Sequence, residues 1–175
     1  MPMERATSFS LVRDADKDLV GQVTLTFSDR YRRRIRLRMD DGQGFMLDLA
    51  EVTQLSDGGF LNLSDGAGQI AVCAAVEEVL EVRTPDPSEL VRWAWHLGNR
   101  HLPVQFLGAE GLRIAWDPVI ADMLRGLGAE PEKLEAPFAP EGGAYGGGPT
   151  YGHSHGDGHA HGHHHHADGE HHHDH

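Results

Sequence analysis

The stretch that decides the fold is Asp86-Pro-Ser-Glu-Leu-Val-Arg-Trp-Ala-Trp-His-Leu-Gly-Asn99, which carries both the start and the stop signal of a helix. Asp86 can cap the first turn, a proline suits the first helical position, and a glutamate two residues later completes the signature. The Gly-Asn pair supplies the stop. An apolar stripe at helical spacing lies between the two signals, formed by Leu90, Trp93, Ala94 and Leu97.

Strand patterns precede and follow this helix, and a second predicted helix comes after them with a further strand pattern behind it. The second helix has the same start signal, Asp117-Pro118, and Gly128 is its stop. The resulting order, β-α-β-β-α-β, is that of the ferredoxin-like split β-α-β unit. We therefore predict a ferredoxin-like domain over residues 76–140. Its strand candidates are Glu77–Val82, Pro103–Leu107, Leu112–Trp116 and Lys133–Ala136.

The preceding residues, 1–75, show short alternating segments separated by turn residues, a pattern typical of antiparallel sheets. The segment Arg34-Ile-Arg-Leu-Arg-Met39 alternates most strictly, with arginines on one face and apolar residues on the other. We predict a small all-β domain here, which makes the whole chain α+β. Its strand candidates are Gln22–Phe27, Arg34–Met39, Phe45–Leu49, Phe60–Leu63 and Gln69–Ala74.

The composition disfavours several classes of function. The 15 Lys+Arg and 27 Asp+Glu leave a net charge of −12, which argues against nucleic acid and anionic membranes as partners. The longest apolar run, Ile70–Val76, is far shorter than the ~20 residues that a membrane span needs. Because Cys73 is the single cysteine, neither an intramolecular disulfide nor a cysteine-based zinc ribbon can form. We expect a soluble, cytoplasmic protein.

Histidine has an extreme distribution along the chain. Of the 14 histidines, 12 lie in the last 25 residues, after a glycine-rich tether. Such a composition cannot build a packed core, so we expect residues 141–175 to be a disordered tail. The tail histidines are His153, His155, His159, His161, His163, His164, His165, His166, His171, His172, His173 and His175.

The tail has the chemistry of a metal-binding segment. Imidazoles separated by one residue, as in His153-Ser-His155, let a chain wrap one nickel, zinc or copper ion with several nitrogens. Copper heads the order of intrinsic affinity, so the metal cannot be chosen from these ligands alone. A purification tag is the alternative explanation of terminal histidines. The interleaved glycines and acids, with no unbroken run longer than His163–His166, favour a natural segment.

Only two histidines lie elsewhere, His96 and His101. His96 falls in the last turn of the predicted helix, where a capping or packing role is favoured over ligation. His101 follows the helix stop on an accessible loop, and the two roles are evenly weighted there. One histidine cannot hold a metal, so His101 needs partners from the tail or from a second protomer. A two-fold axis would supply a second His101.

Three segments of the chain carry a family resemblance. They are His96-Leu-Gly-Asn-Arg-His-Leu-Pro103, Asp117-Pro-Val-Ile-Ala-Asp-Met-Leu-Arg-Gly-Leu-Gly128 and Ala136-Pro-Phe-Ala-Pro-Glu-Gly-Gly-Ala-Tyr145. These segments resemble the urease accessory protein UreE family, and the most specific part is Gly98-Asn-Arg-His-Leu-Pro103. The arginine-rich strand Tyr31–Arg38 and the histidine-rich tail are also similar to that family, so the resemblance covers essentially the whole chain.

The resemblance implies a function and a set of partners. It implies an N-terminal domain that contacts other proteins, a C-terminal domain that forms a homodimer, and delivery of Ni²⁺ to apo-urease. The partners would be the urease apoprotein and the other urease accessory proteins, including the GTPase. His101 matches the family's metal ligand at the dimer interface. Some members carry a His-x-His pair where this chain has Trp116-Asp-Pro118, so an auxiliary site there is not expected.

The second concentration of functional side chains is basic. Six arginines lie between Arg30 and Arg38, and an isolated basic stripe can mark a nucleic-acid surface. Because the chain as a whole is acidic, we favour a docking patch for an acidic protein partner. The residues expected to form the patch are Arg32, Arg34, Arg36 and Arg38.

The leading hypothesis from the sequence is a nickel metallochaperone for urease maturation. The alternative is a metal storage or buffering protein whose function lies in the tail. A folding catalyst such as a prolyl isomerase is a weaker third hypothesis, because the body lacks that resemblance. No nucleophile motif or phosphate-binding loop is present, so we do not expect an enzyme.

Overall fold

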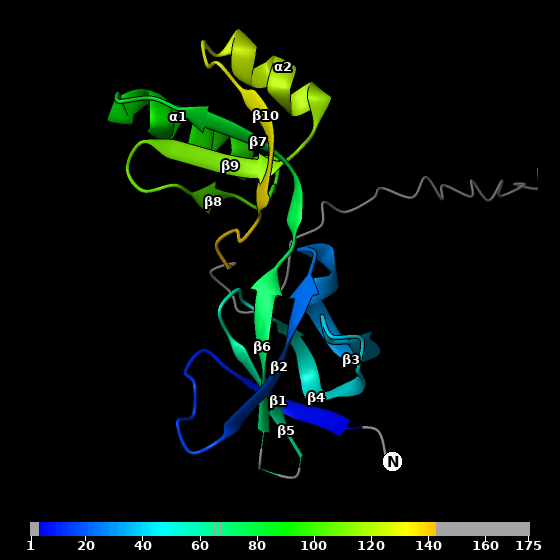
Figure 1. The fold of residues 1–175 in the computed structure, drawn as a ribbon. Coiled ribbons are helices and arrows are strands. Elements are labelled where there is room, and N and C mark those ends of the chain that lie inside the picture. The colour runs from blue at the N-terminus through cyan, green and yellow to red at the C-terminus, as the bar shows by residue number, and fades with distance from the viewer. Residues whose placement is uncertain (1–3, 65, 67, 143–175) are drawn as a thin grey trace, which may run out of the picture.

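The computed structural model describes residues 4–64, 66 and 68–142 of the chain. It has two sheets, a 3-10 turn η1 (Ser28–Arg30) and two helices (Figure 1). The predicted α+β class is confirmed, and the predicted tail lies outside the described residues. None of the helices in the described part of the chain could cross a membrane. The remaining elements are β1 (Glu4–Ser10), β2 (Asp18–Leu25), β3 (Tyr31–Arg38), β4 (Gly44–Gln54), β5 (Phe60–Leu63), β6 (Gly68–Ala74), β7 (Val76–Arg83), α1 (Pro87–Gly98), β8 (Gln105–Phe106), β9 (Gly111–Ala115), α2 (Pro118–Gly126) and β10 (Glu132–Pro137).

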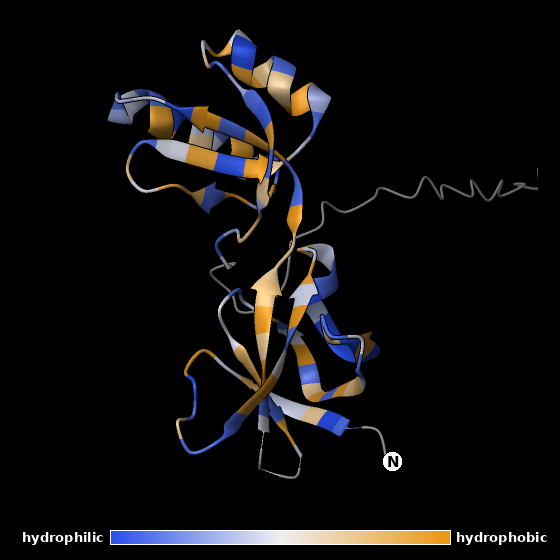
Figure 2. Cartoon of the chain, in the orientation of Figure 1, coloured by the Kyte–Doolittle hydropathy of each residue, from blue (hydrophilic) through white to orange (hydrophobic). Residues whose placement is uncertain are grey.

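The N-terminal domain is a six-stranded sheet in the order β2-β6-β5-β1-β4-β3. Buried and less buried residues alternate along β5 and the first half of β4, which gives these strands one core face, whereas β6 is hydrophobic along most of its length (Figure 2). The antiparallel pattern expected from the sequence holds for three strand pairs, β1 with β5, β3 with β4 and β5 with β6, whereas β1 pairs with β4 and β2 pairs with β6 in parallel. Alternation within a strand does not reveal which distant strand becomes its neighbour. The fully buried core residues include Ala6, Phe45, Leu47, Leu55, Leu61, Ile70 and Val72.

The C-terminal domain has the strand order β10-β7-β9-β8, the order of a ferredoxin-like unit. Both helices contribute to one hydrophobic core with β7 and β9, so they cover the same face of the sheet. The strand expected over Pro103–Leu107 is shorter than predicted, since only Gln105 and Phe106 pair with β9. Pro103 has no N–H for a ladder bond. The core includes Leu80, Val82, Trp93, Leu97, Leu112, Ile114 and Leu124.

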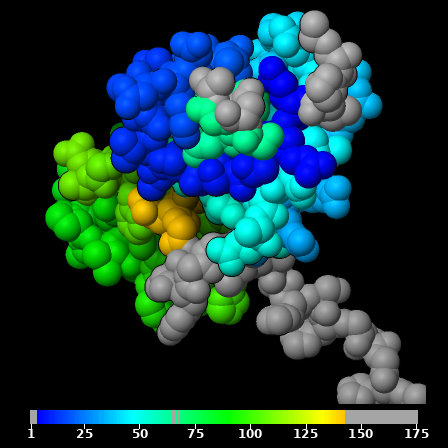
Figure 3. All heavy atoms as spheres, turned by 90° about the horizontal axis from the view of Figure 1, so that it is seen from below, coloured from blue at the N-terminus to red at the C-terminus, as the bar shows by residue number. Residues whose placement is uncertain are grey.

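A small cluster joins the two domains. The ring of Phe27, just before η1, packs edge-on against Phe138, just after β10, with 5.3 Å between ring centroids. Arg30 is buried, and its guanidinium donates to the carbonyl oxygens of Leu55 and Phe138. Burial lowers the pKa of Arg30. The end of the described chain, orange in Figure 3, therefore lies against the N-terminal domain as well as its own.

Candidate metal-binding site

Helix α1 is fixed at both ends, and it carries the loop that holds His101. At the start, the Asp86 carboxylate accepts a hydrogen bond from the Ser88 amide at 2.8 Å, which lowers the pKa of Asp86. Toward the end, Trp93 and Leu97 are buried in the core of the C-terminal domain. Because the helix is capped and packed, the position of the following loop is set by the core.

His101 has a left-handed backbone, with a φ of 55°. Its amide donates to the Gly98 carbonyl at 2.9 Å, and the Leu102 amide donates to the Leu97 carbonyl at 3.4 Å. This pair of bonds is the Schellman motif, in which the left-handed residue is usually glycine. Among the residues that the structure describes, His101 is the only non-glycine with a positive φ. Gly98 ends the helix as predicted, but the left-handed turn comes three residues later.

The side chain of His101 is exposed, as the sequence predicted. A left-handed conformation costs an L-residue roughly 1 kcal/mol relative to glycine. The backbone at this position therefore favours glycine, and the imidazole has no packing role that would offset the cost. Strain of this kind at an exposed polar side chain points to a function for that side chain.

His96 has a different environment. Its half-buried ring lies edge-on to Trp95, with 4.9 Å between ring centroids and an interplanar angle of 83°. The His96 carbonyl accepts a bond from the Arg100 guanidinium at 3.1 Å. These contacts fit the packing role that the sequence favoured for His96.

A single protomer supplies an incomplete ligand set in the part of the chain that is described. No group of three or more His, Cys, Asp or Glu side chains there is arranged to hold a metal ion. The predicted tail ligands, residues 153–175, lie outside that part. His101 is thus one accessible imidazole that requires further ligands from elsewhere.

The chain returns to the His101 loop before the tail begins. The Ala139 amide donates to the Gln105 side-chain carbonyl at 3.0 Å, and the Glu141 amide donates to the Val104 carbonyl at 2.9 Å. Val104 is three residues from His101, so their Cα atoms are at most about 11 Å apart. The point from which the tail departs is therefore close to His101.

Exposed apolar side chains lie on the outer surface of the same helix. Val91 is 68% exposed and Trp95 is 62% exposed, and they are one turn apart on α1. Phe106, on the edge strand β8, is 49% exposed. Exposed apolar side chains of this kind are suited to contact with another chain.

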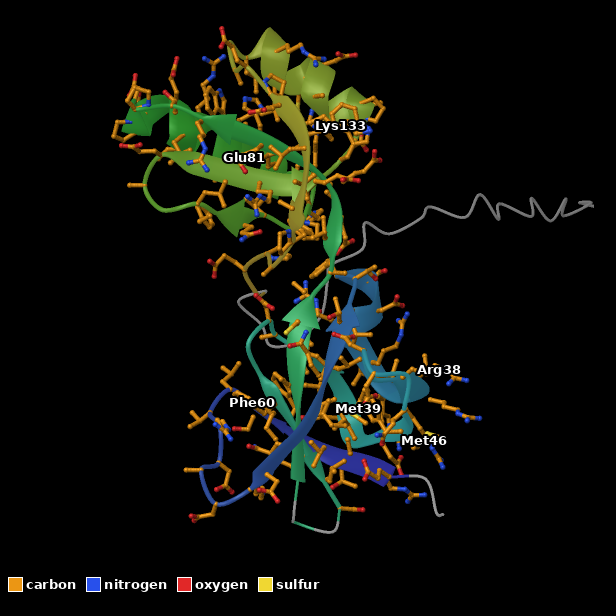
Figure 4. The ribbon with its side chains drawn as sticks, in the orientation of Figure 1. Arg38, Met39, Met46, Phe60, Glu81 and Lys133 are labelled. Carbon is orange, nitrogen blue, oxygen red and sulfur yellow. The ribbon has the colours of Figure 1, made fainter. Side chains whose placement is uncertain are left out.

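At Trp116-Asp-Pro118, where some family members have a His-x-His pair, the side chain of Trp116 contacts Lys133. Lys133, labelled in Figure 4, lies over the Trp116 ring, with its Nζ 4.9 Å from the ring centroid. The same Nζ is 2.5 Å from the Glu78 carboxylate. Trp116 therefore has a structural role.

Comparison with known proteins agrees with this architecture in both domains. A family model described as the UreE urease accessory protein, N-terminal domain, matches residues 12–75, and the model of the C-terminal domain matches residues 77–175. The chain belongs to the UreE family. The resemblance seen in the sequence is thereby confirmed. The N-terminal match covers β2 to β6 and leaves out β1, and the C-terminal match covers the second sheet from the second residue of β7 onward.

Individual relatives are similar over most of this chain. A urease accessory protein UreE from Rhodopseudomonas palustris strain HaA2 is 55% identical over 123 residues, which are 70% of this chain and 56% of that protein. The UreE of Beijerinckia indica is 50% identical over 125 residues, 71% of each chain. The UreE of Cupriavidus necator is 48% identical over 143 residues, 82% of this chain and 71% of that protein. The match thus spans little more than half the length of the first of these relatives.

The arginine patch of the UreE N-terminal domain differs from its prediction at two positions. Arg34, Arg36 and Arg38 share one exposed face of β3, opposite Asp48, Met46 and Gly44 of β4. The register with β4 shifts between Arg32, opposite Thr53, and Arg34, opposite Asp48, and the Arg32 guanidinium forms an ion pair with Asp29 at 2.8 Å.

Arg5 of β1 belongs to the same surface, and the sequence reasoning missed it. Arg5 lies opposite Met46 on the other side of β4, and its guanidinium is 3.2 Å from the Asp48 carboxylate. Ala6 is buried and Arg5 beside it is exposed, as expected for neighbouring residues of a strand. The sequence contains no signal for the parallel pairing that brings Arg5 beside Met46.

Proposed function

We propose that this chain is a nickel metallochaperone that delivers Ni²⁺ to apo-urease. Membership of the UreE family supports a role in urease maturation, and the relatives are themselves named urease accessory proteins. The observation that carries the proposal is the exposed imidazole of His101 at a backbone position that favours glycine. The function is binding and delivery, with no catalysis by the chain.

The proposed site is shared by two protomers. A metal needs more than one imidazole, and a two-fold axis beside the His101 loop supplies a second one with no further sequence requirement. The exposed Val91 and Trp95 offer an apolar surface for such contact on α1, the helix that leads into the His101 loop. We therefore propose a homodimer with nickel held between the two His101 side chains.

The tail is proposed to collect nickel and to add ligands to an ion that the two His101 side chains can already hold without it. Its first histidine, His153, follows Glu141 by twelve residues. A random glycine-rich chain of that length spans about 19 Å on average. This is more than the maximum of about 11 Å between the Cα atoms of His101 and Val104, the residue to which the Glu141 amide donates. Tethering on this scale gives millimolar effective concentrations. Ni²⁺ is the proposed cargo, and imidazole ligands accept Zn²⁺ and Cu²⁺ as well.

Delivery requires docked complexes. The proposed partners are the urease apoprotein and the other urease accessory proteins, including the GTPase, in the cytoplasm. The single cysteine fits a reducing compartment.

The test is activation of purified apo-urease, in the presence of its accessory proteins, with nickel supplied only as the complex with this chain. The expected result is activation by the native chain and a loss of about tenfold or more with His101→Ala, although the tail still loads metal. A matched control, His96→Ala, should activate like the native chain. Equal activation by His101→Ala would contradict the proposal.

The 12 tail histidines favour a second function, the storage or buffering of divalent metal. In that case the tail alone would account for all nickel bound by the chain. Equal activation by His101→Ala would therefore leave storage as the better account.

A further inference from the structure

The outer surface of β1, β4 and β3 carries four arginines around one methionine. We call this surface the arginine face. Arg38 and Met46, labelled in Figure 4, belong to it. Strand register places Met46 at its centre, because Arg5 and Arg36 lie opposite Met46 on either side of β4. The face consists of Arg5, Arg34, Arg36, Arg38, Met46 and Asp48.

The charges on the arginine face are only partly balanced. Asp48 is 3.2 Å from the Arg5 guanidinium and 3.4 Å from that of Arg34. Within the described part of the chain, neither Arg36 nor Arg38 forms an ion pair, and Arg38 donates only to the Gly42 carbonyl. Four arginines and one aspartate leave a local charge of +3 on a chain whose net charge is −12.

The centre of the face is apolar. Met46 is half-buried, and its neighbours along β4, Phe45 and Leu47, point into the core. A methionine side chain adapts its shape to an incoming group. An apolar centre inside a charged rim is the usual anatomy of a protein interface.

We propose that the arginine face docks an acidic segment of a partner protein, in which carboxylates flank an apolar side chain that packs on Met46. The free guanidinium groups of Arg36 and Arg38 suit carboxylates, which bind them through paired hydrogen bonds. A phosphate backbone would supply anions but no apolar side chain for the half-buried Met46, so the apolar centre of the face favours a peptide over nucleic acid. The proposal is independent of nickel binding.

The direct test is binding of a fluorescein-labelled synthetic peptide, Asp-Glu-Asp-Leu-Glu-Asp-Glu, to the full chain by fluorescence anisotropy. The expected result is saturable binding that weakens as salt rises from about 0.05 to about 0.3 M. Reversal of both free charges, Arg36→Glu with Arg38→Glu, is expected to weaken binding about tenfold or more.

A second pair of reversals controls for net charge. Arg13→Glu with Arg125→Glu changes the net charge by the same amount at two exposed arginines outside the arginine face. This pair should bind the peptide almost like the native chain. Thermal unfolding and nickel stoichiometry, measured on both pairs, identify any variant that fails to fold and separate this proposal from the delivery function.

The apolar centre has its own test. Met46→Ser should weaken peptide binding a few-fold, whereas Met46→Leu should retain it, and replacing the leucine of the peptide by serine should reproduce the loss.

Four results would overturn the proposal. They are the absence of binding to the native chain, an equal loss in the control pair, indifference to Met46→Ser, and tighter binding of a short DNA duplex than of the peptide. The last would make the face a nucleic-acid surface.

Discussion

The two helices of the C-terminal domain end in the same hydrogen-bond pattern on different residues. After α2, the Gly128 amide donates to the Arg125 carbonyl and the Ala129 amide to the Leu124 carbonyl, both at 3.0 Å. Gly128 has a φ of 89°, and it is the left-handed residue of that motif. After α1, the equivalent position is His101, with a φ of 55°.

The difference separates what the backbone requires from what the proposed function requires. At Gly128 the left-handed conformation is adopted by glycine, the residue for which it costs least. At His101 the same conformation is adopted by a residue that it strains. The helix and the core behind it fix the backbone of His101, and the imidazole is exposed.

Exchanging the two residues should have its largest effect on nickel affinity. In a chain that ends at Thr150, His101→Gly is expected to reduce nickel affinity about 100-fold or more, because it removes the imidazole from both protomers. Gly128→His places an imidazole in the same type of turn after α2 and is expected to leave nickel affinity unchanged. Isothermal titration calorimetry of both variants tests this. Unchanged nickel affinity in His101→Gly would show that His101 is not a nickel ligand and that the two turns do not differ in function.

Acidification should have the next largest effect. Ligating imidazoles must be neutral, and the ordinary pKa of histidine is ~6.5, so binding is complete above that pH and is lost below it. Between pH 7.5 and 5.5 we expect apparent nickel affinity to fall about tenfold for each imidazole at the site. Dialysis of the full chain at both values provides the measurement. Retention of full stoichiometry at pH 5.5 would argue for ligands other than histidine.

The stability of the fold should respond in opposite directions at the two turns. His101→Gly is expected to raise the free energy of unfolding of the metal-free chain by about 0.5–1 kcal/mol, because glycine relieves the left-handed strain. Gly128→Ala is expected to lower it by about 1 kcal/mol. A Cβ at position 128 would meet nothing within 4 Å, so that loss measures the backbone alone. Thermal unfolding should show shifts of about 2–4 °C. A loss of stability in His101→Gly would contradict the strain argument.

His96 should show the smallest effect on nickel. Its ring packs against Trp95, so His96→Phe is expected to change nickel affinity by less than about twofold. The same calorimetry gives the value, and a loss comparable to that of His101→Gly would place His96 in the ligand set.

The sequence was sufficient to predict the features that depend on short-range chemistry. Asp86 with Pro87 marked the start of α1, and the paired signals around Asp117 marked α2. The order of helices and strands then predicted the ferredoxin-like unit. His101 was identified as accessible because it follows the helix stop.

Other features depend on contacts between distant segments or on backbone angles. The left-handed turn at His101 could not be predicted, because its Gly98-Asn-Arg-His sequence places the glycine three residues early. Arg5 joins the arginine face only through a parallel pairing of β1 with β4, for which alternation within each strand contains no information. The shift in register between Arg32 and Arg34 is likewise a property of the pair of strands.

The most direct test of the central claim is equilibrium dialysis of Ni²⁺ against the chain that ends at Thr150, at pH 7.5. If His101 side chains from two protomers form the site, about one ion should be bound for every two chains. Absence of binding would contradict that account and would assign the metal of this protein to its histidine-rich tail.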